Sequence, residues 1–142
     1  MTTVVDVNVM FAILVSGHAH HPAAWDWWQQ QADQSVGLCL YSRMGTLRLL
    51  SNAKAMGGSP FLPEKALETW DIIAADPRCF WLEAEASHDF HLRRLVIGRQ
   101  ASSNLWTDAW FAALASSNNS RLTSFDSDFR SFNLAHFEHL TP

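Results

Sequence analysis

Cysteine is scarce in this chain of 142 residues, which contains only Cys39 and Cys79. The two lie far apart, each in an apolar stretch, so we expect buried free thiols and a reducing compartment rather than a disulfide framework. No apolar run reaches the ~18 residues that a membrane-spanning helix needs. No basic leader precedes the first predicted strand, so we expect no secretory signal and a cytoplasmic location.

An excess of positive charge is also missing, because 10 Lys and Arg face 14 Asp and Glu, for a net charge of -4. This excludes a globally basic nucleic-acid-binding protein, but not an enzyme that grips phosphates through a bound metal and local arginines. Hydrophobic residues make up 48% of the chain, which predicts a substantial core and argues against disorder. The length suits one domain, which we expect to span residues 1–142.

The chain alternates predicted strands with predicted helices. Residues 2–9 (TTVVDVNV) form a β-branched run that is apolar on both faces, as expected for the buried central strand of a parallel sheet. Further strands are predicted at residues 35–41, 80–83, 121–125 and 137–141, and helices at 8–15, 20–33, 43–51, 63–75, 87–97 and 105–116. We expect Ser42 to cap the helix at 43–51. The alternation predicts an α/β fold, a three-layer αβα sandwich with a mainly parallel sheet of about five strands.

Two of these strands run directly into an aspartate, Asp6 and Asp126, and parallel strands bring such residues to one edge of the sheet. Asp108 lies four residues after the predicted cap Asn104, where the positive helix start favours a carboxylate. Asp128 follows two residues after Asp126. Carboxylates ~4–5 Å apart would repel by roughly 4 kcal/mol per pair at an effective dielectric constant of 20, so such a cluster requires a cation. Oxygen ligands suit Mg²⁺ or Mn²⁺, which can clamp a phosphate and activate water.

Each acid also has a purely structural explanation, since aspartates at strand ends often cap helices or form turns. This explanation is strongest for Asp128. His18, His20 and His21 form a cluster that could suggest a zinc site. Zinc sites usually add a second pair of ligands elsewhere in the chain, and the sequence has no such pair, so we expect a solvated helix start instead.

Other side chains have two possible roles each. Trp106 and Trp110 flank Asp108 and could contact RNA, with burial as the alternative. A positive rim around the acids could come from four arginines, Arg48, Arg93, Arg94 and Arg99, with surface salt bridges as the alternative for each.

Three stretches together resemble the signatures of the PIN-domain family. They are residues 5–9 (VDVNV), residues 105–115 (LWTDAWFAALA) and residues 122–129 (LTSFDSDF). The closest group is the VapC-type toxin ribonucleases of prokaryotic toxin–antitoxin pairs. Residues 42–52 (SRMGTLRLLSN) also resemble the third helix of that family, so the resemblance covers essentially the whole chain.

The resemblance implies a small endoribonuclease that uses Mg²⁺ or Mn²⁺. Asp6, Asp108 and Asp126 would hold the metal, with Asp128 as an outer member, and a metal-bound water would attack an RNA phosphodiester. The family also implies a homodimer, and a cognate antitoxin whose peptide arm reaches the acidic cleft.

One position departs from the family pattern. A glutamate is common near the start of the third helix, and this chain has Arg43 and Met44 there. The arginine could pair with the aspartates and partly replace the cation, or swing outward to hold an RNA phosphate. A catalytically silent PIN domain that binds RNA or an antitoxin is therefore the alternative function. A phosphatase-like hydrolase with Asp6 as nucleophile fits less well, because Asn8 stands where such enzymes carry a second acid.

Overall fold

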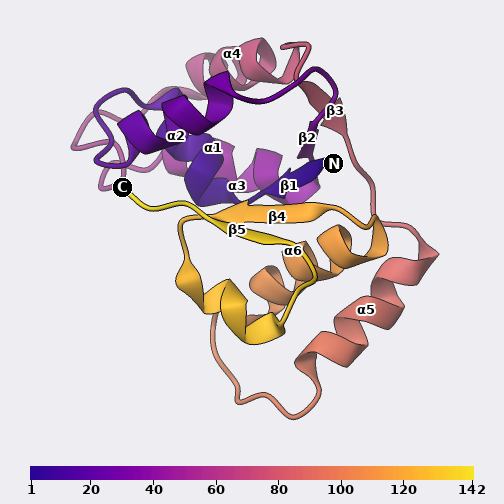
Figure 1. Cartoon of the computed structure of the whole chain (residues 1–142). Coiled ribbons are helices and arrows are strands. Elements are labelled where there is room, and N and C mark those ends of the chain that lie inside the picture. The colour runs from indigo at the N-terminus through magenta and orange to yellow at the C-terminus, as the bar shows by residue number, and fades with distance from the viewer.

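A five-stranded parallel sheet forms the centre of the molecule in the computed structural model, which describes residues 1–142 (Figure 1). Its strands lie in the order β3-β2-β1-β4-β5. They are β1 (Thr3–Val5), β2 (Val36–Leu38), β3 (Cys79–Trp81), β4 (Arg121–Ser124) and β5 (Phe137–His139). In the register, Val4 pairs with Gly37 of β2 on one side and with Leu122 of β4 on the other. The first strand is thus the central one, as predicted.

Helices cover both faces of the sheet. They are α1 (Val7–Leu14), α2 (His21–Gln29), α3 (Leu40–Leu50), α4 (Pro63–Ala74), α5 (Ala86–Val96), α6 (Leu105–Ser117) and the 3₁₀ helix η1 (Ser127–Phe132). In Figure 1, α1 to α4 lie on one side of the sheet, and α5, α6 and η1 lie on the other. The predicted α/β fold, a three-layer αβα sandwich, is confirmed.

Successive residues of β1 point into two separate cores, as the two-residue period of a strand requires. Val5 packs in a core with Trp28 of α2 and Trp70 of α4, whereas Val4 packs with Phe111 of α6 and Phe129 of η1. Because both side chains are fully buried, the strand is fixed from both faces, and the residue that follows it has a defined position.

The predicted extent of the first strand, residues 2–9, is wrong at its end. The strand stops at Val5, and Val7 already begins α1. The cause is Asp6, which has an extended backbone and whose side chain accepts a hydrogen bond of 2.7 Å from the Val7 N–H. Asp6 is therefore the N-cap of α1, a role that satisfies one of the free amide groups at a helix start.

The predicted cap of the third helix is also displaced. Cys39 holds the N-cap position of α3, and Ser42 lies three residues further on. The Ser42 hydroxyl accepts a hydrogen bond of 2.8 Å from the Cys39 N–H, the reciprocal contact of a capping box. Ser42 thus stabilises the start of this helix from its first turn rather than from its cap.

Close packing of α1 against α3 requires the glycine at position 45. A Cβ atom at Gly45 would lie 2.6 Å from Cγ2 of Val7, the first residue of α1. A glycine inside a helix costs about 1 kcal/mol relative to alanine, and here the contact offsets that cost. The contact fixes the start of α1 and hence its cap, Asp6.

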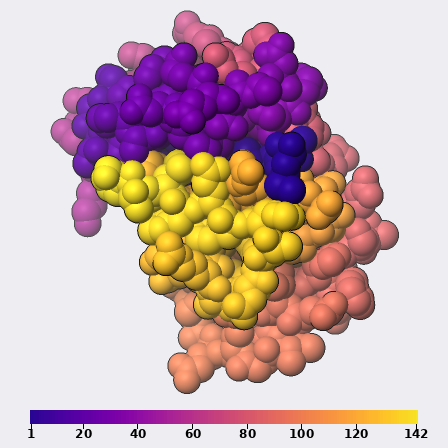
Figure 2. All heavy atoms as spheres, viewed as in Figure 1, coloured from indigo at the N-terminus to yellow at the C-terminus, as the bar shows by residue number.

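The C-terminal segment (yellow in Figure 2) lies on the surface, between the N-terminal half of the chain and the α5–α6 region. Cys39 and Cys79 are free and buried, as predicted. Burial raises the pKa of the Cys79 thiol to about 12, so the side chain stays protonated. No helix of the chain is both long enough and apolar enough to cross a membrane.

Candidate active site at the carboxyl edge of the sheet

Asp6 lies at the carboxyl end of the central strand and is held by both of its oxygens. Oδ1 accepts the capping hydrogen bond from Val7, and Oδ2 accepts one of 2.7 Å from the Ser124 hydroxyl. Burial raises the pKa of Asp6; the Ser124 and Val7 hydrogen bonds oppose the rise, and the charge of Asp126 adds to it. The side chain is therefore fixed in position before any ligand arrives.

Ser124 joins the ends of β1 and β4. Besides donating to Asp6, its Oγ accepts a hydrogen bond of 2.9 Å from the Asp126 N–H and one of 3.2 Å from the Asn8 side-chain amide. Asn8 Oδ1 in turn accepts a hydrogen bond of 3.3 Å from the Phe125 N–H. Sequence reasoning gave neither Ser124 nor Asn8 a role in the site. The available signal was that each is a polar residue two positions from one of the acids, Asp6 or Asp126, in an otherwise apolar stretch of sequence.

Asp108 lies in the first turn of α6 and faces the acids at the strand ends. Its pKa rises from 3.8 to about 6, first because the side chain is partly buried and then because Asp6, Asp126 and Asp128 repel its charge. No protein group donates a hydrogen bond to its carboxylate. The structure thus brings the three predicted acids and Asp128 within electrostatic range of one another.

Asp126 and Asp128 begin the 3₁₀ helix η1. Asp126 Oδ1 accepts a hydrogen bond of 2.9 Å from the Asp128 N–H, so Asp126 caps η1 as Asp6 caps α1. The side chain of Asp128 is exposed and lines, together with Asp108, Asn104 and Arg99, a hollow of about 670 Å³. Capping uses one oxygen of Asp126 and leaves its second oxygen without a hydrogen bond, so this acid can cap η1 and still bind a cation.

No basic side chain neutralises the four acids. The ion pairs of the chain lie elsewhere and are Arg78–Asp76, Arg93–Asp89 and Arg121–Glu138. Arg43 forms no ion pair, and its buried Nε has no hydrogen-bond partner. The hypothesis that Arg43 pairs with the aspartates and replaces a cation is therefore wrong for this structure.

The chemistry of these donors fits a hard divalent cation, because all are carboxylate oxygens and their mutual repulsion is uncompensated. The arrangement is nevertheless open. No group of three or more His, Cys, Asp or Glu side chains lies close enough together to hold a metal ion. A shared ion therefore requires side-chain movement, with water completing its coordination, as Mg²⁺ commonly allows.

The histidines near residue 20 have local packing roles. His18 Nδ1 accepts a hydrogen bond of 3.0 Å from the His20 N–H, and His21 Nδ1 lies 2.7 Å from the Ala12 carbonyl oxygen. The His20 ring packs on Phe125 with centroids 4.6 Å apart. The three rings are half-buried in these contacts, so the predicted solvated helix start is only partly exposed.

The two tryptophans beside Asp108 differ in how far their side chains are exposed. Trp106 is 62% exposed, whereas Trp110 packs against Tyr41, with ring centroids 4.6 Å apart, and its carbonyl oxygen lies 3.0 Å from His88 Nε2. Only Trp106 is free to meet a ligand.

Comparison with known proteins gives the same family from sequence. A family model for the PIN domain matches residues 3–133. Ribonuclease VapC41 of Mycobacterium tuberculosis is 30% identical over 134 residues, which cover 89% of this chain and 90% of the relative. Ribonuclease VapC29 of the same organism is 29% identical over 132 residues, covering 89% of this chain and 87% of the relative.

Known structures agree in fold. VapC20 from Mycobacterium tuberculosis, a toxin that cleaves the sarcin–ricin loop, superposes with a TM-score of 0.67 at 20% identity, covering 94% of this chain and 97% of that one. VapBC2 from Rickettsia felis, bound to a DNA fragment from its promoter, gives a TM-score of 0.70 at 14% identity, covering 99% of this chain and 100% of the other. With the family model spanning nearly the whole sequence, the chain belongs to the PIN domain family.

Proposed function

We propose that this chain is a metal-dependent endoribonuclease, the toxin of a type II toxin–antitoxin pair, with residues 1–142 forming one cytoplasmic PIN-like domain. The observation that carries the proposal is the group of four acids, Asp6, Asp108, Asp126 and Asp128, whose charges repel and which no arginine or lysine neutralises. The relatives named as VapC ribonucleases support the reaction class.

In this proposal, Asp6, Asp108 and Asp126 hold Mg²⁺ or Mn²⁺, and Asp128 lies at the outer side of the site. When bound, such an ion polarises a phosphate oxygen and lowers the pKa of a water molecule. The contribution of the chain is preorganisation. Ser124 fixes the orientation of Asp6 and the backbone of Asp126, so that the carboxylates of two acids from different strands lie at the same edge of the sheet.

The reaction is tested by incubating RNA with the protein and Mn²⁺, comparing wild type with Asp108→Ala. Asp71→Ala is the matched control, because Asp71 is an exposed aspartate on α4, on the other face of the sheet. Cleavage by wild type and the control, lost in Asp108→Ala, is the expected result. RNA binding without cleavage in all three proteins would favour the silent domain instead.

Metal binding is tested separately by calorimetric titration of Mn²⁺ into wild type and Asp6→Asn. We expect weaker binding in the variant, because one charged ligand is lost while the hydrogen bond to Val7 can persist through the remaining side-chain oxygen. Identical titration curves would contradict the assignment of Asp6 as a ligand.

The partners in this proposal are RNA, an antitoxin and a second copy of the chain. An exposed apolar face supports the homodimer: Leu40 is 57% exposed, Tyr41 44% and Trp81 46%, and Leu40 and Trp81 line one shallow hollow with Trp110. Such a face is unusual for a monomer. Analytical ultracentrifugation should show a dimer for wild type and a monomer for Leu40→Lys. An unchanged dimer would place the interface elsewhere.

An antitoxin partner fits the acidic edge electrostatically, since a basic side chain from a second protein would offset the repulsion among the acids. The solved relatives include VapBC complexes from Rickettsia felis and from nontypeable Haemophilus influenzae. Co-expression with the product of an adjacent short gene should yield a complex without nuclease activity. Full activity in such a complex would contradict this part of the proposal.

A further inference from the structure

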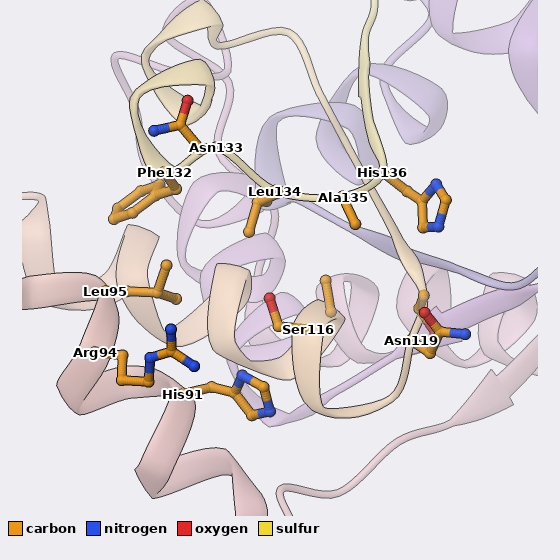
Figure 3. A pocket seen from close by; sticks show the side chains of 12 residues that line it. His91, Arg94, Leu95, Ser116, Asn119, Phe132, Asn133, Leu134, Ala135 and His136 are labelled. Carbon is orange, nitrogen blue, oxygen red and sulfur yellow. The ribbon is translucent and has the colours of Figure 1, made fainter.

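A second hollow lies at the opposite end of α6 from Asp108. It has a volume of about 450 Å³ and is formed by α5, the last turn of α6, the turn before β4 and the segment that joins η1 to β5. Figure 3 shows Arg94 and His91 side by side on α5, Ser116 on the neighbouring helix, and residues 132–136 passing across them. These elements meet at the amino ends of the strands, the edge opposite to the acids.

The lining of this hollow is chemically the reverse of the acidic site. Among its twelve residues there is no aspartate or glutamate, although the whole chain carries a net charge of -4. It contains the guanidinium of Arg94, the imidazoles of His91 and His136, and the side-chain amide of Asn119. All of these groups can donate hydrogen bonds, and one carries a permanent positive charge. The set suits an anion.

Arg94 is free to bind such an anion, in contrast to its neighbours. Arg93 pairs with Asp89 at 2.6 Å, and Arg99 donates to the Ser131 carbonyl oxygen at 2.6 Å. Arg94 has neither an ion pair nor a hydrogen bond, and only lies over the Phe90 ring at 5.5 Å. An unpaired guanidinium that faces a hollow without carboxylates is a ready phosphate ligand.

The hollow is a neighbour of the proposed catalytic region. Phe132, which is buried, lines both this hollow and the one that contains Asp108 and Asp128, so the two hollows lie on either side of this residue. The guanidinium of Arg99 lies over the same ring at 4.2 Å. A polyanion that extends from the acids past Phe132 would meet Arg99, which lines the first hollow, and then Arg94, which lines the second. From Asp108 to Ser116, eight residues of helix span about 12 Å, the length of about three to four stacked nucleotides.

We propose that this hollow binds a backbone phosphate of single-stranded RNA, about three to four nucleotides from the bond that is cut. The inference rests on the proposed ribonuclease function and adds a distal subsite to it. The acidic hollow on the other side of Phe132 favours RNA over an acidic protein segment, because one RNA strand can place one phosphate at the acids and a later one at Arg94. Arg94 is the central ligand, and the imidazoles of His91 and His136 supply further donors.

The test compares Arg94→Gln with Arg93→Gln, which removes the adjacent charge outside this hollow. Cleavage is measured on an RNA of about ten nucleotides and on a dinucleotide, in Mn²⁺, over a range of salt concentrations. We expect Arg94→Gln to lower kcat/KM about 10-fold on the longer RNA, to leave the dinucleotide unaffected, and to reduce the salt slope by about 0.7. Arg93→Gln should match wild type in all three.

A charge series at Ala135, an exposed residue of the same lining, makes the test independent of Arg94. Ala135→Asp should weaken the cleavage of longer RNA and Ala135→Lys should strengthen it, with unchanged melting temperatures. If wild type cleaves RNA but Arg94→Gln equals Arg93→Gln, the subsite is wrong and the nuclease stands. If wild type cleaves no RNA, the proposed function fails, and the subsite with it. If Arg94→Gln loosens only the complex with the antitoxin, the hollow takes an acidic peptide, and the RNA assignment is overturned.

Discussion

The two ends of α6 carry opposite chemistry. At its start, Asp108 faces three other carboxylates, with no basic partner. At its end, Arg94 and two histidines surround a hollow without any carboxylate. Both placements agree with the helix dipole, which favours negative charge at the start of a helix and positive charge at its end. The helix dipole could therefore be what stabilises the ionised form of Asp108 at the start of the helix.

For Asp108, the free energy of the dipole can be compared with the free energy that corresponds to its pKa shift. The rise of its pKa from 3.8 to about 6 corresponds to at most about 3 kcal/mol against the ionised form. A helix start contributes only ~0.3–1 kcal/mol in its favour. Burial and repulsion therefore outweigh the dipole, so the acid cluster is kept at a cost to stability. The basic end carries no such cost, because Arg94 is exposed and can be solvated.

Of the substitutions that remove the contrast between the acidic and basic ends of α6, Asp108→Asn is expected to have the largest effect on cleavage and stability. Cleavage should fall roughly 100- to 1000-fold, the range seen when one electrostatic group of an active site is removed. At pH 7 without metal, the variant should be more stable than wild type by about 2 kcal/mol, because the strained charge is gone. Urea unfolding and an RNase assay measure the two quantities, with Asp71→Asn as the control. A less stable variant would mean that the charge of Asp108 is not strained.

The pH dependence of the free energy of unfolding also tests whether the charge of Asp108 destabilises the folded protein. Between pH 4 and 6 the unfolded Asp108 loses its proton while the folded one keeps it, so the folded state binds more protons. The free energy of unfolding should therefore fall as the pH rises through this window, by up to about 2 kcal/mol for this group. Urea denaturation at several pH values should show this fall in wild type and a smaller one in Asp108→Asn. Saturating Mn²⁺ should reduce the fall, since a bound cation favours the ionised acid.

A smaller effect is expected for Ser124→Ala. The substitution removes the hydroxyl that links Asp6 to the Asp126 backbone, and should cost about 1–2 kcal/mol of stability and about 10-fold in cleavage rate. Ser127→Ala is the control, because Ser127 is an exposed serine three residues away whose hydroxyl makes no hydrogen bond. Equal melting temperatures and equal rates for the two variants would show that the link does not position the acids.

The smallest effect is expected for Arg43→Gln. Because Arg43 pairs with none of the acids, the affinity for Mn²⁺ should change by less than about 2-fold. Calorimetric titration of both proteins measures this. A clearly tighter affinity in the variant would mean that Arg43 competes with the cation in solution, and would revive the hypothesis that its charge takes the place of a metal.

The fold and the acids could be predicted because they depend on local patterns. An apolar run that ends in an acid identifies a buried strand and its carboxyl end, and this placed Asp6 and Asp126 on one edge of the sheet. The direction of Arg43 could not be predicted, since it depends on how α3 rotates against α1. That rotation is set by the contact between Gly45 and Val7, which are distant in sequence.

The hollow around Arg94 was beyond sequence reasoning for a related reason. Its lining comes from α5, α6 and the η1–β5 segment, and no single stretch of sequence carries its pattern. Ser124 and Asn8 were missed because a serine or asparagine next to a strand end most often signals a turn. Their importance depends on the pairing of β1 with β4, which brings them together across more than a hundred residues.

The double duty of Asp6 has a practical consequence for anyone who needs an inert version of this protein. One of its oxygens begins α1 and the other is anchored to the neighbouring strand, so replacing it by alanine removes a helix cap together with the chemistry. The Asp108 side chain, in contrast, caps no helix and accepts no hydrogen bond from the protein. An inactivated toxin intended for crystallisation or antitoxin capture is therefore better made there, where loss of function and a sturdier fold coincide.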